Sequence, residues 1–357
     1  MENASRVHSW ISNITRHNVK GLDLCLRLDK TFFIPSSLFK YESLTKLELS
    51  ASCNIHIPKS FSFPKPKSLT LSYIRFTEDD GWNEQHFSNC PVLESLFLDD
   101  CTWFGSRKFC ILTPALKVLE IYNYSPKEDG LQDYDLKIHA PDLESIVYWN
   151  VVAKDYDLSS FVKLVNADIY FSVYDGEERI GHGEERKAVS KFLRALAHVK
   201  SLIIATAELE AVLFAEDYVN ILPTFNNPNK LDLTLGPASD ELIFALLKAA
   251  PNLKKLRFNW DIFGDDDDDD NDDTVYNETD DDLFGHLQSV LFRGFVWRRG
   301  LRWAKLILKT AKSLQKMTIR AGNCFLKEKE LVEPELQNLP RASLECVLSK
   351  TCDRVIS

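Results

Sequence analysis

Side chains capable of catalytic chemistry are scattered through this sequence rather than grouped. Its eight histidines stand at positions 8, 17, 56, 86, 139, 182, 198 and 286, and none belongs to a His-Glu-x-x-His metal motif. The sequence also has no Gly-x-Ser-x-Gly nucleophile turn and no glycine-rich phosphate loop. His182, between two glycines, is expected in an exposed loop, which is a poor support for preorganised catalysis. We therefore expect a protein that is not an enzyme and that needs no cofactor.

Aspartates offer the other chemistry, in a segment from Asp265 to Asp282 that holds 12 acidic residues and no lysine or arginine. Six consecutive aspartates lack the alternating ligands and the glycine turn of an EF-hand loop, so only weak, nonspecific divalent binding fits this run. Like charges repel, and the pattern is typical of a solvated, extended insertion. Without this segment, the chain has 43 basic and 41 acidic residues, and its body is nearly neutral.

Composition excludes several classes of protein. Hydrophobic residues make up 45% of the chain, enough for a sizeable core and too many for wholesale disorder. No apolar run approaches the roughly 20 residues of a membrane helix, and the N-terminus has no secretory apolar region. The eight cysteines form no Cys-x-x-Cys pair, which favours buried thiols over disulfides or zinc. The expected location is intracellular, in the cytoplasm and/or nucleus.

A repeated pattern, apolar-x-x-apolar-x-apolar, organises the chain. Leu44-x-x-Leu47-x-Leu49 and Leu116-x-x-Leu119-x-Ile121 are clear copies. The middle positions of the copies are 22, 47, 69, 96, 119, 146, 167, 202, 231, 256, 290 and 317. Their mean spacing is about 27 residues, inside the range of leucine-rich repeats.

The last two apolar positions of each copy are separated by one residue, so both point to the same face of a short strand. One such unit cannot bury its apolar face alone, whereas stacked units form a parallel sheet over a continuous core. The fold class is therefore α/β: a leucine-rich-repeat solenoid with a curved parallel sheet on its concave face and helices and turns on its convex face. Helical spacing predicts helices in the ranges 184–199, 241–249 and 301–311. A further helix, with Val7, Trp10, Ile11 and Ile14 on one side, is expected to cap the first repeat.

The residues that alternate with the core positions should point to the concave face. Four successive repeats place aromatic side chains there, at Phe97, Tyr122, Trp149 and Tyr170, and the acidic side chains beside them are Asp99, Glu120 and Asp168. The C-terminal repeats place basic side chains there instead, among them Lys255, Arg257, Arg293, Lys316 and Arg320. Aromatic anchors amid polar groups are typical of a protein-binding hot spot.

Four alternatives to this hypothesis stand. Loops can cover the aromatic residues, or these residues can simply suit strands. The basic positions could bind nucleic acid, but no aromatic side chains interleave them for base stacking. The acidic segment could instead lie over the basic positions as a weak electrostatic cover.

Some segments of the sequence form longer, more specific motifs: Val7-x-x-Trp10-Ile11, Val290-Leu-Phe-Arg-Gly-Phe295, Leu306 to Ile319, and Leu339-Pro-Arg-Ala-Ser343 followed by Cys346. With these motifs the chain resembles plant F-box proteins with leucine-rich repeats and a C-terminal FBD domain. The resemblance implies the substrate-selecting region of a cullin-type (SCF) ubiquitin ligase receptor, with an unknown target protein as its partner. It implies a Skp-type adaptor and a cullin as partners only if an F-box stands upstream, because only six residues precede Val7.

Two further points qualify the resemblance. The turn after Gly294 is usually acidic in this family, and here it reads Trp297-Arg-Arg-Gly-Leu-Arg302. The alternative function is a free-standing scaffold or decoy that binds targets without promoting their ubiquitination. The expected organisation is a capping helix at 1–18, a repeat array at 19–262, an acidic disordered insertion at 263–283, and FBD-like repeats with a cap at 284–357. No membrane partner is expected.

Overall fold

The computed structural model describes the chain as two compact units, Met1–Leu196 and Ala197–Ser357, here called unit 1 and unit 2. The described residues are 2–14, 17–27, 32–39, 41–51, 55–56, 65–77, 86–104, 108–123, 134–172, 182–213, 218–236, 240–260, 283–294, 297–321, 342–343 and 347–352. The acidic run Asp265–Asp282 and the terminal-motif residues Leu339–Arg341 and Cys346 lie outside them.

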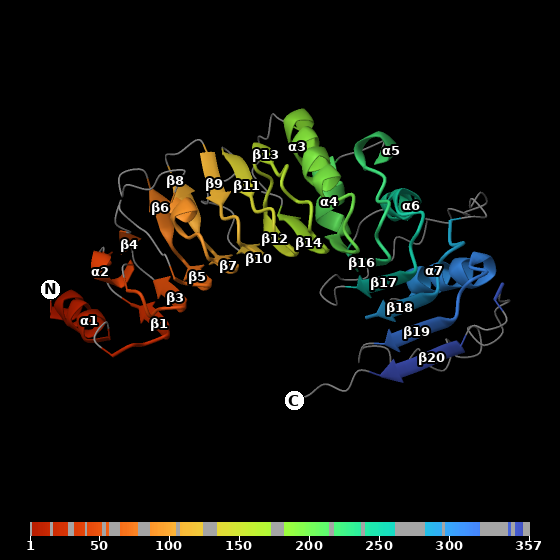
Figure 1. The fold of residues 1–357 in the computed structure, drawn as a ribbon. Helices are drawn as coiled ribbons and strands as arrows, with labels where there is room; N and C mark the ends of the chain where they lie inside the picture. Colours follow the sequence, from red (N-terminus) through yellow and green to blue (C-terminus); the bar gives the residue numbers. More distant parts are fainter. Residues whose placement is uncertain are drawn as a thin grey trace. The chain divides into compact units, whose positions relative to one another are not determined.

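Unit 1 contains a parallel sheet in which each predicted repeat contributes one strand (Figure 1). The strands in order are β1 (Gly21–Leu26), β3 (Lys46–Ala51), β5 (Ser68–Ser72), β7 (Ser95–Asp99), β10 (Val118–Tyr122), β12 (Ser145–Val151) and β14 (Asn166–Ser172). The middle positions of the repeats stand side by side in register, as in the pairing of Leu96, Leu119 and Ile146. These three side chains are at most 1% exposed, so the repeat period correctly predicted the core.

The outer layer of unit 1 consists largely of strands, which the sequence pattern did not predict. A second parallel sheet joins β9 (Lys108–Leu112), β11 (Asp135–His139) and β13 (Asp155–Asp157). Two smaller pairs join β2 (Phe32–Phe33) to β4 (Ile55–His56) and β6 (Arg75–Thr77) to β8 (Thr102–Phe104). The remaining elements of unit 1 are α1 (Glu2–Ile14), α2 (Ser36–Phe39), η1 (His86–Asn89) and α3 (His182–Ala195).

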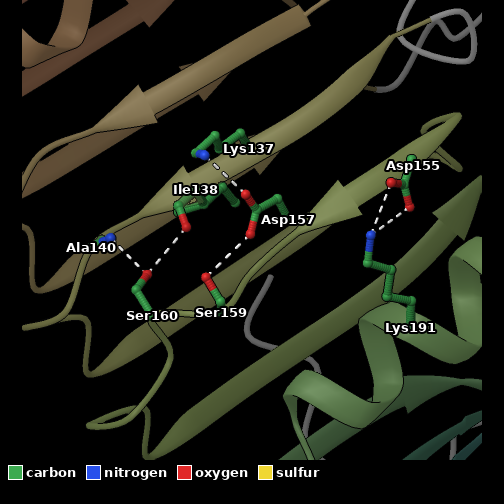
Figure 2. Close-up of polar contacts among 8 residues, drawn as sticks. All are labelled: Lys137, Ile138, Ala140, Asp155, Asp157, Ser159, Ser160 and Lys191. Carbon is green, nitrogen blue, oxygen red and sulfur yellow. Dashed lines mark hydrogen bonds and ion pairs between the residues drawn. The ribbon is translucent and has the colours of Figure 1, made fainter.

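Hydrogen bonds and ion pairs connect the strands of this outer layer (Figure 2). Ser160 Oγ accepts a hydrogen bond from the amide of Ala140 at 2.9 Å and donates one to the carbonyl of Ile138 at 3.1 Å. Lys137 forms an ion pair with Asp157 at 3.0 Å, and its hydrogen bond holds the pKa of that carboxyl below its usual range. The turn after β13 is thereby bonded to β11.

A buried aromatic cluster supports the strand β12 from the core side. The rings of Tyr148, Tyr156 and Phe192 lie with centroids 4.8–6.0 Å apart. Tyr156 Oη donates to Tyr148 Oη at 3.2 Å, and Tyr148 Oη donates to the carbonyl of Val151 at 2.6 Å. On the outer side, Lys191 of α3 pairs with Asp155 of β13 at 2.8 Å (Figure 2). These contacts hold β12 in place. Trp149, which follows Tyr148 in this strand, points to the opposite face of the sheet.

Unit 2 continues the same type of repeat with helices in its outer layer. Its strands in order are β15 (Ser201–Ala205), β16 (Lys230–Leu235), β17 (Lys255–Trp260), β18 (Ser289–Arg293), β19 (Lys316–Ala321) and β20 (Val347–Cys352). Its helices are α4 (Thr206–Leu213), α5 (Tyr218–Ile221), α6 (Asp240–Ala249) and α7 (Trp297–Thr310). Figure 1 shows α6 and α7 on one side of the strands. The strand β20, parallel to β19, follows the last predicted repeat and was not expected.

Two local predictions were wrong. The stripe on α1 buries Val7 and Ile11, but Trp10 is 57% exposed and takes no part in the capping contact. His182 and Gly183, expected in a loop, begin the helix α3. Acidic residues near that end, Glu184 and Glu185, favour the helix because they interact well with its N-terminal dipole.

A half-buried ion pair joins α6 to α7 in unit 2. The Arg299 guanidinium contacts Asp240 Oδ1 through Nε at 2.8 Å and through a terminal nitrogen at 2.7 Å, and it donates to the carbonyl of Gly236 at 3.1 Å. Trp303 Nε1 donates to the same carboxylate oxygen at 3.1 Å. Asp240 is the first residue of α6. Arg299 belongs to the basic segment Trp297–Arg302, which departs from the family pattern, and this segment therefore has a structural role here.

Candidate protein-interaction face

The face of each sheet opposite the buried leucine ladder is here called the open face, and it corresponds to the predicted concave face. On β7 and β10 the side chains alternate between buried and half-buried, and the half-buried ones include Phe97 and Tyr122. The same alternation recurs on β12, β14 and β17. Most of the predicted binding residues therefore lie where the sequence placed them, beside core positions that are buried.

The aromatic residues of unit 1 form a row of three rather than of four. Strand register places Tyr122 opposite Trp149, and Trp149 opposite Tyr170. Phe97 lies opposite Glu120, two positions earlier along the strands, and the residue opposite Tyr122 on β7 is Asp99. We call Tyr122, Trp149 and Tyr170 the aromatic row.

The rings of the aromatic row are held in defined orientations. Trp149 has Tyr122 at 5.6 Å in an edge-to-face arrangement and Tyr170 at 5.7 Å in a tilted one, measured between ring centroids. Trp149 Nε1 donates to Asp168 Oδ1 at 3.0 Å, and Tyr122 Oη donates to Glu120 Oε2 at 2.8 Å. Rings that are already oriented lose little conformational entropy on binding, which is a property of good interface anchors.

Acidic groups border this row on several sides. The positions opposite one another in the neighbouring row are Glu120, Val147 and Asp168. Partial burial raises the pKa of the Asp99 carboxyl above its usual value, with Asp100 adding to the effect and a hydrogen bond from Ser72 opposing it. The open face of unit 1 thus combines aromatic rings with carboxylates.

Tyr73 is a candidate surface residue that the repeat pattern missed. It directly follows β5, is 57% exposed, and has a left-handed backbone with φ of 60°. Its amide donates to the carbonyl of Asp99 at 2.8 Å, which places it beside the end of β7. In the sequence, Tyr73 is an aromatic residue one position beyond the predicted strand. The alternation between buried and outward residues does not extend to that position, so it could not assign Tyr73 to a face.

Unit 2 presents basic side chains on its open face. One row places Lys230 opposite Lys255, with Ser289 and Lys316 continuing it across β18 and β19. A second row holds Asp232, Arg257, Leu291 and Thr318, and a third holds Thr234, Asn259, Arg293 and Arg320. The five predicted basic residues therefore lie on three adjacent strands.

Asp232 is covered although it lies on the open face. It follows the middle position 231 of its repeat, so the alternation predicts that it points outward, yet it is only 4% exposed because Lys230 and Arg257 cover it. Its Oδ2 contacts Lys230 Nζ at 2.9 Å and an Arg257 nitrogen at 3.5 Å. Its Oδ1 is buried and has no hydrogen-bond partner.

Among the described residues, no group of three or more His, Cys, Asp or Glu side chains is arranged to hold a metal ion. None of the described helices has the length and apolar character to cross a membrane. Cys90, Cys101 and Cys110 are buried thiols outside any disulfide, as predicted, whereas the Cys25 thiol is exposed. Burial raises the pKa of the Cys101 thiol to about 12.

The stacked parallel strands, the buried leucine ladder and the separate outer layer define a leucine-rich-repeat protein of the α/β class. A family model for the leucine-rich repeats of the FBD-associated F-box protein At5g56370 matches residues 7–169. The matched range covers most of unit 1, including Tyr122 and Trp149, and ends one residue before Tyr170.

Curated relatives come from Arabidopsis thaliana. The F-box/LRR-repeat protein At4g14096 is 28% identical over 254 residues, covering 71% of this chain and 53% of that protein. The F-box/FBD/LRR-repeat protein At1g78750 is 24% identical over 350 residues, covering 95% of this chain and 74% of that protein. The chain thus spans about half the length of the first relative. These matches confirm the resemblance of this chain to the plant F-box/FBD/LRR-repeat family.

Proposed function

We propose that this chain is a protein-recognition module whose open face binds a target protein. The observation that carries this proposal is the aromatic row, in which a half-buried tryptophan is held between two tyrosines and bonded to Asp168. Trp and Tyr side chains in fixed orientations surrounded by polar groups are the usual energetic centre of a protein interface. The acidic residues Asp99, Glu120 and Asp168 supply the polar surroundings.

The proposal extends to a cellular role. The relatives are named F-box proteins. The resemblance to this family implies a ubiquitin ligase that its members reach through a Skp-type adaptor. We propose that the open face selects substrates for such a ligase inside the cell, as the recognition region of its receptor. The second candidate, a scaffold or decoy, uses the same face but leaves the target's abundance unchanged.

Site-specific photo-crosslinking tests recognition by the open face. A photoreactive phenylalanine analogue replaces Val147, which lies between Glu120 and Asp168 on the open face. The matched control replaces Val162, which is 72% exposed in the turn between β13 and β14. In plant cell extract, position 147 should capture a protein that position 162 does not.

The Trp149→Ala substitution adds a second condition to this experiment. It should reduce capture at position 147 at least tenfold. Equal capture at 147 and 162, or capture that Trp149→Ala leaves unchanged, would refute recognition by this face. Receptor and scaffold then separate on one measurement, because the captured target should accumulate in plants carrying Trp149→Ala only if the protein promotes its degradation.

A further inference from the structure

The open face of unit 2 carries an excess of positive charge that the rest of the described unit does not neutralise. Lys230 and Arg257 share Asp232, as described above. Among the described residues, no carboxylate lies within ion-pair distance of the other four cations of this face, which are Lys255, Arg293, Lys316 and Arg320. We call these four the unpaired cations.

The arrangement of the unpaired cations is unfavourable for the protein alone. Arg293 on β18 and Arg320 on β19 are direct partners in the strand register. Like charges directly opposite one another on neighbouring strands destabilise a sheet. In addition, Arg320 Nε is buried without a hydrogen-bond partner in the described structure. An anionic ligand would offset the repulsion, and arginines at facing register positions suit a carboxylate or a phosphate.

Asp232 distinguishes between the two classes of anion. Its Oδ1 is a buried acceptor that lacks a donor, and burying a polar atom without a partner is costly. A peptide main chain offers N–H donors, whereas the phosphodiester backbone of DNA offers none. The Lys230 side chain is 27% exposed and that of Arg257 42%, and displacement of these two side chains would open Oδ1 to a ligand. The neighbouring positions Leu291 and Thr318 give no aromatic surface for base stacking.

From these contacts we infer that the open face of unit 2 binds an acidic segment of a partner protein. Side-chain carboxylates of the segment pair with the unpaired cations, and a main-chain N–H of the segment donates to Asp232 Oδ1. This inference rests on the proposed function of the open face and names the chemistry of the partner at unit 2. It involves strands other than those that hold the aromatic row, so the two can be tested separately.

Fluorescence anisotropy with synthetic probes tests the inference on the full chain. The probe is a labelled peptide of alternating glutamate and serine, twelve residues long, and its control replaces every glutamate by glutamine. The acidic probe should bind the full chain at least tenfold more tightly than the glutamine control. Failure of the acidic probe to bind would overturn the inference, while crosslinking from position 147 would remain as a separate test of the proposed function.

Matched variants separate local recognition from net charge. The double variant Arg293→Glu with Arg320→Glu should weaken binding of the acidic probe at least tenfold. The control, Lys309→Glu with Lys312→Glu, makes the same change in net charge at exposed residues of α7 and the turn after it. It should change binding less than twofold. Equal weakening by both pairs would overturn the inference, because long-range attraction would then explain binding.

Further measurements test whether misfolding explains the loss of binding, and whether the face binds nucleic acid in preference to a peptide. The neutral pair Arg293→Gln with Arg320→Gln, checked for an unchanged melting temperature, should weaken binding at least fivefold. A probe with the same glutamates but N-methylated main-chain amides should bind the natural chain at least fivefold more weakly. The inference fails if the methylated probe binds equally well, or if a single-stranded DNA dodecamer of matched charge binds more tightly than the peptide.

Discussion

Trp149 and Leu119 occupy neighbouring strands but face opposite sides of the sheet, so their truncation should separate binding from stability. Leu119 is fully buried, and Leu119→Ala should lower the free energy of unfolding by about 2–5 kcal/mol. Trp149→Ala removes ring contacts and one hydrogen bond at a half-buried position, and should cost clearly less stability while weakening target binding by about 2 kcal/mol or more. Urea unfolding measures the first effect. If Trp149→Ala costs as much stability as Leu119→Ala, then the tryptophan is primarily a core residue.

Asp99 makes the stability of unit 1 depend on pH in a defined direction. Because burial raises its pKa in the folded state, the folded chain holds this proton more tightly than the unfolded chain does. The contribution to stability is therefore complete below the unfolded pKa and is lost as pH rises through the folded pKa. Asp99→Asn should raise the melting temperature at pH 7, and the difference should shrink towards pH 3. A variant less stable than the natural chain at pH 7 would show that hydrogen bonding outweighs burial here.

Gly294 belongs to the turn that connects β18 to α7, and the structure explains why glycine stands there. Its φ is +65°, and an added Cβ would lie 2.7 Å from the carbonyl oxygen of Trp260 on β17. Gly294→Ala should therefore cost about 2–4 kcal/mol through backbone strain and overpacking. Gly183→Ala is the control, because its Cβ would meet nothing within 4 Å and its helix favours alanine by up to about 1 kcal/mol. In thermal unfolding, Gly294→Ala should lower the melting temperature and Gly183→Ala should raise it.

Arg299 tests whether the link between α6 and α7 depends on shape as well as charge. Lysine keeps the charge but cannot contact Asp240 through two nitrogens while donating to the carbonyl of Gly236. Arg299→Lys should therefore lower the free energy of unfolding by about 1–3 kcal/mol. The exposed residue Arg194 supplies the control, since Arg194→Lys should change stability by less than about 0.5 kcal/mol. Equal effects of the two substitutions would mean that the contact with Asp240 contributes nothing specific.

The elements that the sequence predicted well are those whose signal recurs with the repeat. Leu47, Leu96 and Leu119 could be assigned to the core because a two-residue alternation, repeated many times, leaves one consistent phase. The outer strands could not be assigned so easily. In β11 the buried residues Leu136 and Ile138 alternate with more exposed ones, whereas in β9 three consecutive residues from Phe109 to Ile111 are buried. Each strand is five residues long and pairs with a strand about one repeat away. A short alternating run does not reveal such a partner.

The candidate site divides in the same way. Alternation predicted that Trp149 and Arg293 lie on the open face, because that depends only on strand phase. It did not predict that Phe97 is outside the aromatic row, since this depends on strand register, nor that Asp232 is covered. The burial of Asp232 depends on how two long side chains fold over it, and no spacing in the sequence encodes that conformation.

At the scale of the whole molecule, the repeat architecture predicts that damage stays local. Each strand of a repeat protein packs chiefly against its neighbours, so stability is close to a sum of repeat and nearest-neighbour contributions. A core truncation in one compact unit should then open that unit while the other keeps its protection from hydrogen exchange. Leu119 and Leu256, each at most 1% exposed, are equivalent positions for this comparison in units 1 and 2.

Leu119→Ala should accelerate amide hydrogen exchange in β7, β10 and β12. The amides of β17, β18 and β19 should exchange at the same rates as in the unsubstituted chain. Leu256→Ala should produce the mirror pattern, with faster exchange in β16, β17 and β18 and natural rates in β7 and β10. Each variant is the control for the other, because both remove the same atoms from equivalent core positions. Hydrogen exchange followed by mass spectrometry resolves these strands separately. Uniform acceleration across both units by either variant would contradict the prediction, because the chain would then unfold as one cooperative block.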